Sequence, residues 1–383
     1  LTTTGFALFA MFFGAGNLVI PPYIGLKMGA ASGAAFVGFF LSGILIPFLA
    51  VLMVSSIGTS FTDLGKRFPA PFVNSLVVLI IVVFGPLVCV PRSGSTTYEV
   101  AIEPFFPMVG KVTFGVIFFT ITLFLALSRS KLVDIIGRWL TPILFLSLIV
   151  LIVEGTINAP KGLTDNGLSF KEAFTFGFSK GYLTLDVLSG VIFSGLIISA
   201  IIQKGYSSER QKREITILSG IIAAGCLVFI YGGLLYLGAT SDVVTTEEVK
   251  YIDILKHIAH KGLGNNGAIV ISVAVAFACL TTAVAIVSAM GGIFETLSHG
   301  RIPYRWGVWG CTLVSFVLSI QSVDQIILYA GYILDFVYPI TIALTLFILL
   351  FGKRVQKKTP YIIGVSFTAV FSAIFVIGNL MES

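Results

Sequence analysis

Eleven apolar stretches, each near the length of a membrane-crossing helix, limit how this 383-residue chain can fold. A helix of about twenty residues crosses the ~30 Å hydrocarbon core of a bilayer, and backbone groups in lipid must be satisfied within the helix. Only 11% of the residues are charged and the mean hydropathy is +1.02, so most of the chain is expected to lie in the lipid bilayer. We therefore expect an all-α polytopic membrane protein. The stretches lie at about 3–29, 32–57, 72–97, 112–127, 132–153, 183–203, 215–239, 267–291, 306–320, 325–351 and 361–380.

Apart from Arg92, the Lys and Arg residues divide unequally between the two sides of the membrane. With a cytoplasmic N-terminus, fifteen fall on the cytoplasmic side and eight on the other. Because positive charge is enriched in cytoplasmic loops, we expect a multi-pass protein of the cell (plasma) membrane with its N-terminus in the cytoplasm. The net charge of +6 is scattered over short loops, so no nucleic-acid partner is expected, and no obligatory protein partner is evident.

The first stretch is interrupted by Gly14-Ala15-Gly16-Asn17, which lies between two apolar runs. Free backbone groups at membrane depth are tolerated only where they line a cavity or pack against protein. The start of a half-helix offers N–H groups and a positive dipole end to an anion, while unwound carbonyls can hold a cation. The interruption therefore predicts a ligand site. The alternative is a packing face, on which two glycines let helices approach closely.

The stretch at 183–203 has a second interruption, midway along, where Ser189, Gly190, Ser194 and Gly195 interrupt the apolar residues. If the first five and the next five spans are repeats, the odd number inverts the second copy, and the two broken helices meet at the membrane midplane. That arrangement is typical of a secondary transporter. The expected organisation is a first repeat at 1–153, an extracellular loop at 154–182, an inverted repeat at 183–351 and an eleventh span within 352–383.

The segment from Phe9 to Pro22, FAMFFGAGNLVIPP, resembles the first-span motif of the bacterial branched-chain amino acid:cation symporters, the BrnQ or LIVCS family. Three further segments are similar to family landmarks: GYLTLD at 181–186, Pro-Arg at 91–92 and Val-Tyr-Pro at 337–339. The resemblance covers nearly the whole chain. It implies a LeuT-like fold and alternating-access import of leucine, isoleucine and valine, coupled to sodium or another monovalent cation. Family members usually have twelve spans, whereas eleven are found here.

The resemblance also implies a sodium site. LeuT-like transporters tend to hold the ion between carbonyls of the first span and a paired hydroxyl motif on the eighth, and Ala-Cys-Leu-Thr-Thr at 278–282 is similar to that motif. A hard ion takes oxygen ligands, and neutral oxygens bind it weakly enough for release. Alternatively, the threonines bond carbonyls of their own helix. No organic cofactor is expected. By position, the sodium ligands are the carbonyls of Ala10, Phe13 and Ala278 and the hydroxyls of Thr281 and Thr282.

A zwitterionic aliphatic amino acid needs N–H donors for its carboxylate, acceptors for its ammonium and an apolar pocket for its side chain. We expect the N–H groups of Gly14, Ala15 and Gly16 to bind the carboxylate. Asn17 can orient either group. Leucine, isoleucine and valine are expected to share one site, because apolar pockets discriminate by only about 1–3 kcal/mol per methylene. The ammonium is expected at the second interruption, around Ser189, Gly190 and Ser194.

Among the charged residues within these ranges, we single out Arg92, Asp186 and Asp335. An ionisable group in a span is a candidate functional residue. We expect Arg92 and Asp335 to pair across the third and tenth spans as part of an outer gate. Asp186, near the outer end of the sixth span, is either functional or an acid that lies at the membrane interface at a helix N-terminus.

The loop at 241–266 carries a capping signal, Thr-Thr-Glu-Glu at 245–248, before apolar residues at helical spacing from Tyr251 to Ile258. We expect a short surface helix there. His257 and His260 lie on it, and two histidines without carboxylate or cysteine partners are more often surface residues than metal ligands.

The sequence contains no motif for an enzyme. None of its three Gly-Lys pairs is followed by Ser or Thr, which excludes a phosphate-binding loop, and no histidine begins a His-Glu-x-x-His motif. A secondary transporter is the prediction. The alternatives are a cation channel, which would reuse broken helices, and a symporter of another small amino acid or solute.

Overall fold

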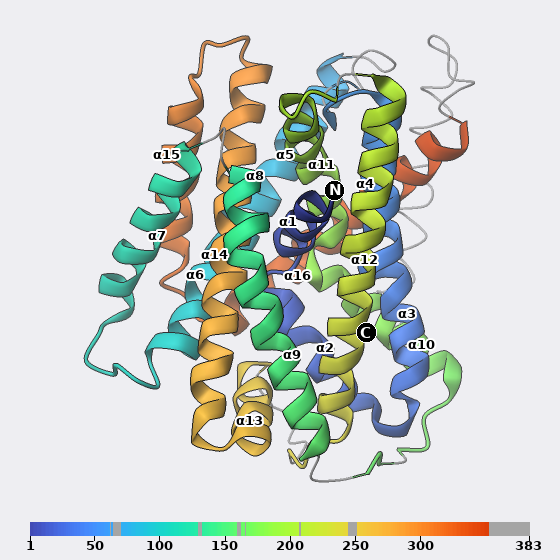
Figure 1. Cartoon of the computed structure of the whole chain (residues 1–383), viewed down its shortest axis with the longest axis vertical. Helices are drawn as coiled ribbons and strands as arrows, with labels where there is room; N and C mark the ends of the chain where they lie inside the picture. The colour runs from blue at the N-terminus through green and yellow to red at the C-terminus, as the bar shows by residue number, and fades with distance from the viewer. Residues whose placement is uncertain are drawn as a thin grey trace.

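The computed structural model describes residues 1–61, 63, 70–128, 132–158, 162–164, 166–206, 208–243 and 251–351. Within these ranges the chain is helical and contains no β-strand, so the all-α prediction is confirmed. The broken first span, α1 (Thr2–Phe12) and α2 (Ala15–Met28), lies inside the bundle with the other helices around it (Figure 1). The eleventh stretch, predicted at 361–380, lies outside the described residues, as does the capping signal at 245–248.

Each of the other four spans predicted in the first half is helical in the structure. Four of the segments are π-helical turns (η2, η4, η5 and η7), which hold an extra residue within a span. The second to fifth spans comprise α3 (Ser32–Phe40), η2 (Leu41–Leu45) and α4 (Ile46–Ile57); α5 (Ala70–Val82), η4 (Val83–Cys89), α6 (Val90–Thr97) and η5 (Tyr98–Ile102); α7 (Lys111–Leu127); and α8 (Leu132–Ile135), η7 (Ile136–Leu140) and α9 (Thr141–Ile157).

The second half forms longer helices. The predicted surface helix is present as α13, between α12 and α14. The elements are α10 (Phe170–Gly181), η8 (Tyr182–Thr184), α11 (Asp186–Gln203), α12 (Glu209–Ala239), α13 (Tyr251–Leu263), α14 (Asn265–Leu297), α15 (Tyr304–Leu318) and α16 (Val323–Phe351).

In the described part of the chain, six helical stretches are long and apolar enough to cross a membrane, or up to seven if a bent pair counts as one span. This number is lower than the predicted eleven because breaks and turns divide the spans differently. The stretch Ala15–Ile57 counts once, although the chain turns within it at Gly29, where φ is +51°. The helices Thr2–Phe12 and Lys111–Leu127 are apolar but shorter than the 18 residues required.

Glycines allow the helices around the first span to approach closely. A Cβ on Gly25 of α2 would lie 1.9 Å from the carbonyl oxygen of Leu235 in α12, and one on Gly238 would lie 2.0 Å from that of Pro22. In the same way, a Cβ on Gly177 of α10 would lie 1.9 Å from the carbonyl oxygen of Ala35 in α3. Small residues at helix interfaces are expected where lipid supplies no hydrophobic drive for association.

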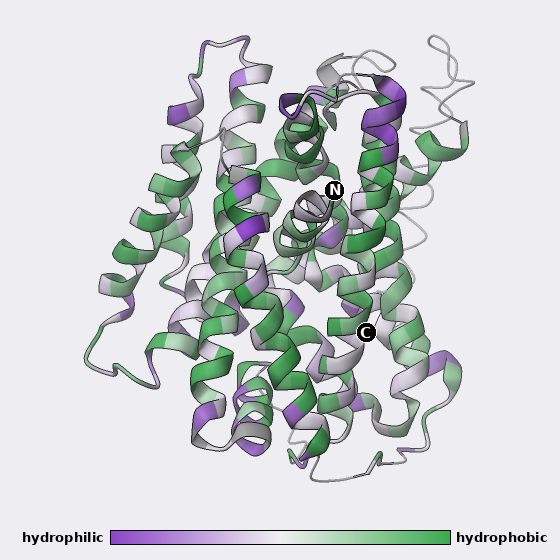
Figure 2. Ribbon diagram, viewed as in Figure 1, coloured by the Kyte–Doolittle hydropathy of each residue, from purple (hydrophilic) through white to green (hydrophobic). Residues whose placement is uncertain are grey.

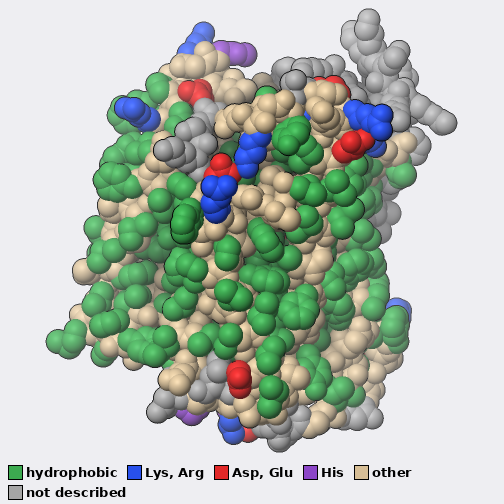
Figure 3. All heavy atoms as spheres, viewed as in Figure 1, with side chains coloured by type: hydrophobic (Ala, Val, Ile, Leu, Met, Phe, Trp, Pro, Cys, Tyr) green, Lys and Arg blue, Asp and Glu red, His purple; other side chains and the backbone are tan. Residues whose placement is uncertain are grey.

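The hydropathy of the surface fits a membrane environment. Large apolar side chains such as Phe124, Trp139 and Leu350 are exposed, while polar residues including Asn17 and Asp186 are buried. Figure 2 shows apolar residues along most of the helices, and Figure 3 shows a mainly apolar face with charged side chains toward its ends. The outer surface therefore suits lipid, and the polar groups lie inside.

The second interruption is not where the sequence analysis placed it. Helix α11 runs unbroken through Ser189, Gly190 and Ser194, and the break lies before it, at η8 and Leu185. The sixth span begins with α10, inside the range predicted as a loop. Helix α10 was missed because it carries two lysines and a glutamate and is only weakly apolar, so hydropathy alone does not identify it.

Candidate transport site

The break in the first span separates α1 from α2 at Phe13 and Gly14. Gly14 is extended, with φ −111° and ψ −165°, and its N–H donates to Oδ1 of Asn17 at 3.3 Å. The side chain of Asn17 therefore fixes the turn, and Gly14 does not offer the free N–H that was predicted. The N–H groups of Ala15 and Gly16 lie in the first turn of α2, where a helix has no partners of its own for them.

The end of α1 meets the threonine pair of α14. The Thr281 hydroxyl lies 3.1 Å from the Ala10 carbonyl oxygen and 3.0 Å from that of Ala278. The Thr282 hydroxyl lies 3.3 Å from the carbonyl oxygens of both Met11 and Phe13, and 3.4 Å from that of Ala10. Four carbonyls and two hydroxyls therefore gather at this point.

This oxygen cluster has the chemistry of a site for a hard monovalent cation. One hydroxyl carries one proton, so Thr282 cannot donate to three carbonyls at once. Its surroundings therefore hold more acceptors than the hydroxyl protons can satisfy, and a cation would satisfy the remainder. The alternative that the threonines bond only their own helix does not describe the contacts, because three of the carbonyls belong to the first span, two in α1 and one at the break.

The break in the sixth span ends at Leu185, a left-handed residue with φ +70°. Helix α11 begins at Asp186, and the N–H of Val187 in its first turn donates to the Tyr338 hydroxyl of α16 at 3.1 Å. The Tyr338 ring packs against Tyr182, with ring centroids 4.9 Å apart. A side chain from another helix thus satisfies a backbone group that the break leaves free.

Asn17, Asp186 and Tyr231 connect the two breaks. Nδ2 of Asn17 donates to both carboxylate oxygens of Asp186, at 2.9 and 2.8 Å, and also contacts the Tyr231 hydroxyl. The Tyr231 hydroxyl, from α12, donates to Oδ2 of Asp186 at 3.0 Å. All three side chains are buried. Asp186 therefore lies between helices in the interior, and the interpretation as an interfacial acid is wrong because α10 precedes it in the span.

Arg92 lies beside both breaks. Its Nη1 donates to the carbonyl oxygen of Leu183 at 2.9 Å, and its guanidinium lies against Gly16. The side chain of Asp335 lies outside the described part of the structure, so the pairing of Arg92 with Asp335 stays a prediction.

The residues predicted to bind the ammonium lie further along α11. The hydroxyl of Ser189 bonds the Leu185 carbonyl at 3.0 Å, and that of Ser194 bonds the Val191 carbonyl at 2.8 Å, both within the same turn of chain. Gly190 packs against α4, where an added Cβ would lie 2.6 Å from the Pro47 carbonyl oxygen. Their contacts are those of an ordinary buried helix face.

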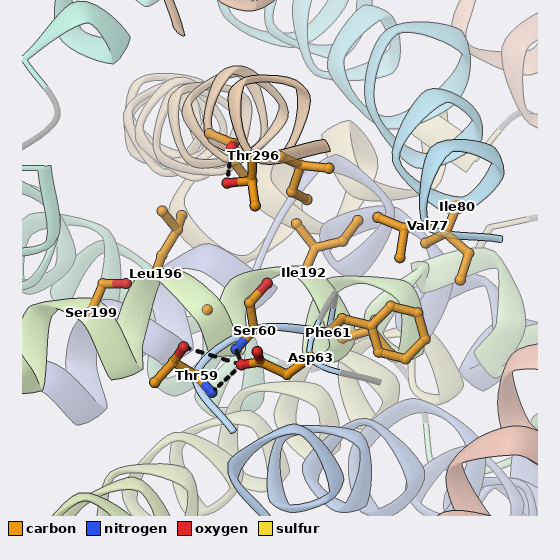
Figure 4. Close-up of a pocket in the computed structure, with 15 residues that line it drawn as sticks. Thr59, Ser60, Phe61, Asp63, Val77, Ile80, Ile192, Leu196, Ser199 and Thr296 are labelled. Atoms are coloured by element: carbon orange, nitrogen blue, oxygen red, sulfur yellow. Dashed lines mark hydrogen bonds between the residues drawn. The ribbon is translucent and has the colours of Figure 1, made fainter. Parts of the chain in front are cut away.

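A cavity of about 290 Å³ opens between α5, α11, α14 and the turn after α4. In Figure 4, Ile192 and Ser199 of α11, Val77 of α5 and Thr296 of α14 surround it. Asp63 lines one side of the cavity. Its carboxylate accepts hydrogen bonds from the N–H groups of Thr59 and Ser60 and from the Thr59 hydroxyl.

Three buried aromatic rings pack together near the first break, and two of them belong to helical segments next to this cavity. The Phe193 ring of α11 is 6.3 Å from that of Phe12, next to the break, and 5.8 Å from that of Phe84 in η4. Phe84 is one turn from Ile80, and Phe193 adjoins Ile192, and both isoleucines line the cavity. We call Phe12, Phe84 and Phe193 the aromatic cluster.

Helix α13 is fixed by a charged cluster outside the spans. Oδ1 of Asp242 lies 2.6 Å from Nε2 of His257, and Oδ2 lies 2.8 Å from Nζ of Lys261. Hydrogen bonds from Lys261 and His257 hold the pKa of the Asp242 carboxyl well below its usual range. His257 thus has a carboxylate partner that the sequence analysis did not pair with it.

Tyr231 and Tyr338 were not among the predicted site residues. Each places a hydroxyl in the middle of an apolar helix, where a buried polar group needs a partner. That requirement was the available signal, although it does not identify which partner each hydroxyl would find.

The fold is shared with solved transporters. A mutant of the Eremococcus coleocola manganese transporter matches with a TM-score of 0.64 at 12% identity, covering 98% of this chain and 85% of that one. The nucleobase-cation-symport-1 family transporter MHP1, in a closed conformation with bromovinylhydantoin bound, matches with a TM-score of 0.62 at 14% identity. The match covers 98% of this chain and 91% of that one. The likeness establishes the LeuT-like fold.

Sequence relatives point to one family. A protein of Staphylococcus aureus named as a branched-chain amino acid carrier is 32% identical over 403 residues, covering 99% of this chain and 90% of the relative. A Staphylococcus epidermidis protein with the same description is 34% identical over 384 residues, covering 94% and 85%. Residues 1–383 match the family described as branched-chain amino acid transport protein. The chain therefore belongs to the branched-chain amino acid transport protein family, whose members are transporters and not enzymes.

Proposed function

We propose that this protein is a secondary active transporter that imports leucine, isoleucine and valine by sodium-coupled alternating access. The observation that carries the sodium coupling is the meeting of the Thr281 and Thr282 hydroxyls with the open carbonyls at the end of α1. Sodium would be held by the carbonyls of Ala10, Phe13 and Ala278 together with these hydroxyls. The family supports the substrates, since proteins named as branched-chain amino acid carriers are among the relatives.

The substrate would bind where the two breaks meet. The first-turn N–H groups of Ala15 and Gly16 favour a carboxylate. The buried carboxylate of Asp186 supplies the negative charge that an ammonium requires, which the hydroxyls of Ser189 and Ser194 lack. We therefore place the ammonium near Asp186.

The two breaks also support an inverted repeat of the first five and the next five spans, with the second repeat starting at α10. In alternating access, such a pair of repeats exposes a central site to one side and then to the other. The 290 Å³ cavity would be the inner part of the route, and the aromatic cluster would separate it from the site.

We place this cavity on the cytoplasmic side. The cavity reaches Ser199, near the end of α11. The turn after α11 and the start of α12 lie at that end of the molecule (Figure 1), and they carry Lys204, Arg210 and Arg213. By the positive-inside rule that end would be cytoplasmic, and we place the N-terminus on the same side.

The test is leucine uptake by the full-length protein in liposomes. An inward sodium gradient is compared with the same vesicles in external choline, for the wild type and for Thr281→Ala. We expect accumulation above equilibrium only with sodium, and its loss in the variant. Equal uptake in choline would exclude sodium coupling, and a proton gradient would then be tested. Flux that never saturates would indicate a channel, and absence of leucine uptake would exclude the proposed substrate.

A further inference from the structure

Arg92 is a buried cation with unused hydrogen-bonding capacity. Its side chain is 1% exposed, in α6 of the third span. Nη1 donates to the Leu183 carbonyl, whereas Nε and Nη2 have no hydrogen-bond partner among the described residues. A charged group held inside a membrane span without its partners is costly, and such a residue is expected to serve a ligand or a counter-charge.

One of the two unsatisfied nitrogens, Nη2, lies at the start of α2. A Cβ on Gly16 would be 2.5 Å from Nη2 and 2.8 Å from Cζ of Arg92, so only glycine permits this contact. Gly16 lies in the first turn of α2, where free N–H groups and the positive end of the helix dipole are found. A guanidinium and a helix N-terminus repel each other unless an anion lies between them.

The geometry of the free nitrogens indicates which anion. Nε and Nη2 form one edge of the planar guanidinium, and such an edge donates two parallel hydrogen bonds to the two oxygens of a carboxylate. Asp186 does not take this place, because no hydrogen bond joins it to Arg92 among the described residues, and its oxygens accept from Asn17 and Tyr231 instead.

We propose that Arg92 binds the carboxylate of the transported amino acid through its Nε–Nη2 edge, together with the N–H groups of Ala15 and Gly16. This inference rests on the proposed function and adds the residue that recognises one end of the substrate. Since Nη1 bonds Leu183 next to the second break, the same guanidinium connects the carboxylate to both broken helices.

The competing role for Arg92 is a gate paired with Asp335. A gate residue alters how fast the site opens, and it does so regardless of whether a ligand has a carboxylate. A carboxylate-binding residue instead changes the preference between ligands that differ only in that group. The test therefore measures ligand preference.

The experiment is competition against labelled leucine bound to the purified full chain in sodium. The competitors are leucine, leucinamide, which lacks the negative charge, and 3-methylbutylamine, which lacks the whole carboxylate. For the wild type we expect leucine to compete at least 100-fold better than leucinamide. In Arg92→Gln, leucine should weaken by roughly 30-fold or more, and leucinamide by less than threefold, so that the preference collapses.

Two further variants make the result decisive. Arg92→Lys keeps the charge but cannot donate two parallel hydrogen bonds to a carboxylate, so we expect an intermediate preference. If Arg92→Gln does not fold, Arg92→Lys takes its place in the test. Asp335→Asn should leave the preference unchanged, and Arg210→Gln, on the exposed start of α12, is the matched control.

The proposal is overturned if Arg92→Gln, or Arg92→Lys in its place, retains the wild-type preference for leucine over leucinamide, or if Asp335→Asn abolishes the preference equally. If the wild type does not bind leucine at all, the proposed function fails instead, so the two failures are distinguishable.

Discussion

The break between α1 and α2 is made by its own residues, whereas the break between α10 and α11 depends on side chains from other helices. Gly14 takes an extended conformation and Asn17 folds back onto its N–H. At the second break, Leu185 has a positive φ, which costs a non-glycine residue about 1–2 kcal/mol. The Tyr338 hydroxyl accepts from the N–H of Val187, two residues after Leu185. Arg92 donates to the carbonyl oxygen of Leu183, two residues before Leu185.

The breaks also differ in chemistry. The first presents neutral oxygens and N–H groups, which suit an ion that must be released, while the second brings the charges of Asp186 and Arg92 into the interior. We infer that the first break supplies the ion site and the second supplies the charges that recognise the substrate. The following changes test this division.

Asp186→Asn should have the largest effect. The substitution removes a buried charge and sets an amide donor against Nδ2 of Asn17. Hydrogen bonds to charged groups contribute about 1.5–3 kcal/mol, so we expect leucine uptake to fall roughly 10- to 100-fold. Initial rates in proteoliposomes measure it, with Asp253→Asn on the exposed face of α13 as the control. Uptake close to wild type would show that the second break does not need its charge.

Thr282→Val should alter the ion dependence and leave the fold intact. Valine has the same shape but lacks the hydroxyl that meets the α1 carbonyls. Loss of one such oxygen is expected to weaken the binding free energy of sodium by about 1–1.5 kcal/mol. The sodium concentration for half-maximal uptake should therefore rise by roughly tenfold. Thr312→Val is matched, because its buried hydroxyl bonds only its own helix at Val308. An unchanged sodium dependence in Thr282→Val would place the ion elsewhere.

Tyr338→Phe tests whether the second break depends on its neighbours. The change leaves the N–H of Val187 buried without its acceptor, which costs about 1–3 kcal/mol. We expect a lower melting temperature in detergent and uptake reduced a few-fold. Tyr332→Phe, at an exposed position of the same helix, should leave both unchanged. Equal melting temperatures for the two variants would contradict the dependence.

Ser189→Ala and Ser194→Ala should have the smallest effects. Both hydroxyls bond carbonyls of their own helix, and alanine is a good helix former. Leucine uptake and its half-saturating concentration should stay within about twofold of wild type. A loss as large as that of Asp186→Asn would restore the original prediction that the ammonium binds at these serines.

Sequence reasoning located the first break because its composition is unusual. Glycine and asparagine in an apolar run are costly to a helix, and the resemblance around them placed Thr281 and Thr282 opposite. Most span positions were also predictable, because length and apolarity are local properties of the chain.

The second break could not be found in this way. Nothing in the composition of Tyr182 to Leu185 distinguishes it from a helix, and the small residues of α11 gave a stronger but misleading signal. Tyr338 is 153 positions from Leu185, and the pairing of distant residues is a property of the fold rather than of either segment. The same holds for the contact between Asn17 and Asp186.

The π-helical turn η4, which precedes Arg92, has a consequence for how this protein tolerates insertions and deletions. Each residue of a helix turns the following side chains by about 100°. Removing one residue between Val83 and Cys89 would let the third span relax into an ordinary helix, equally apolar and equally able to enter the membrane. Because the turn already holds one residue more than an ordinary helix needs, its loss would leave Arg92 facing Gly16 instead of rotating it away. We expect such a variant to keep its preference for an amino acid over an amine, so this turn is where the third span can best lose a residue.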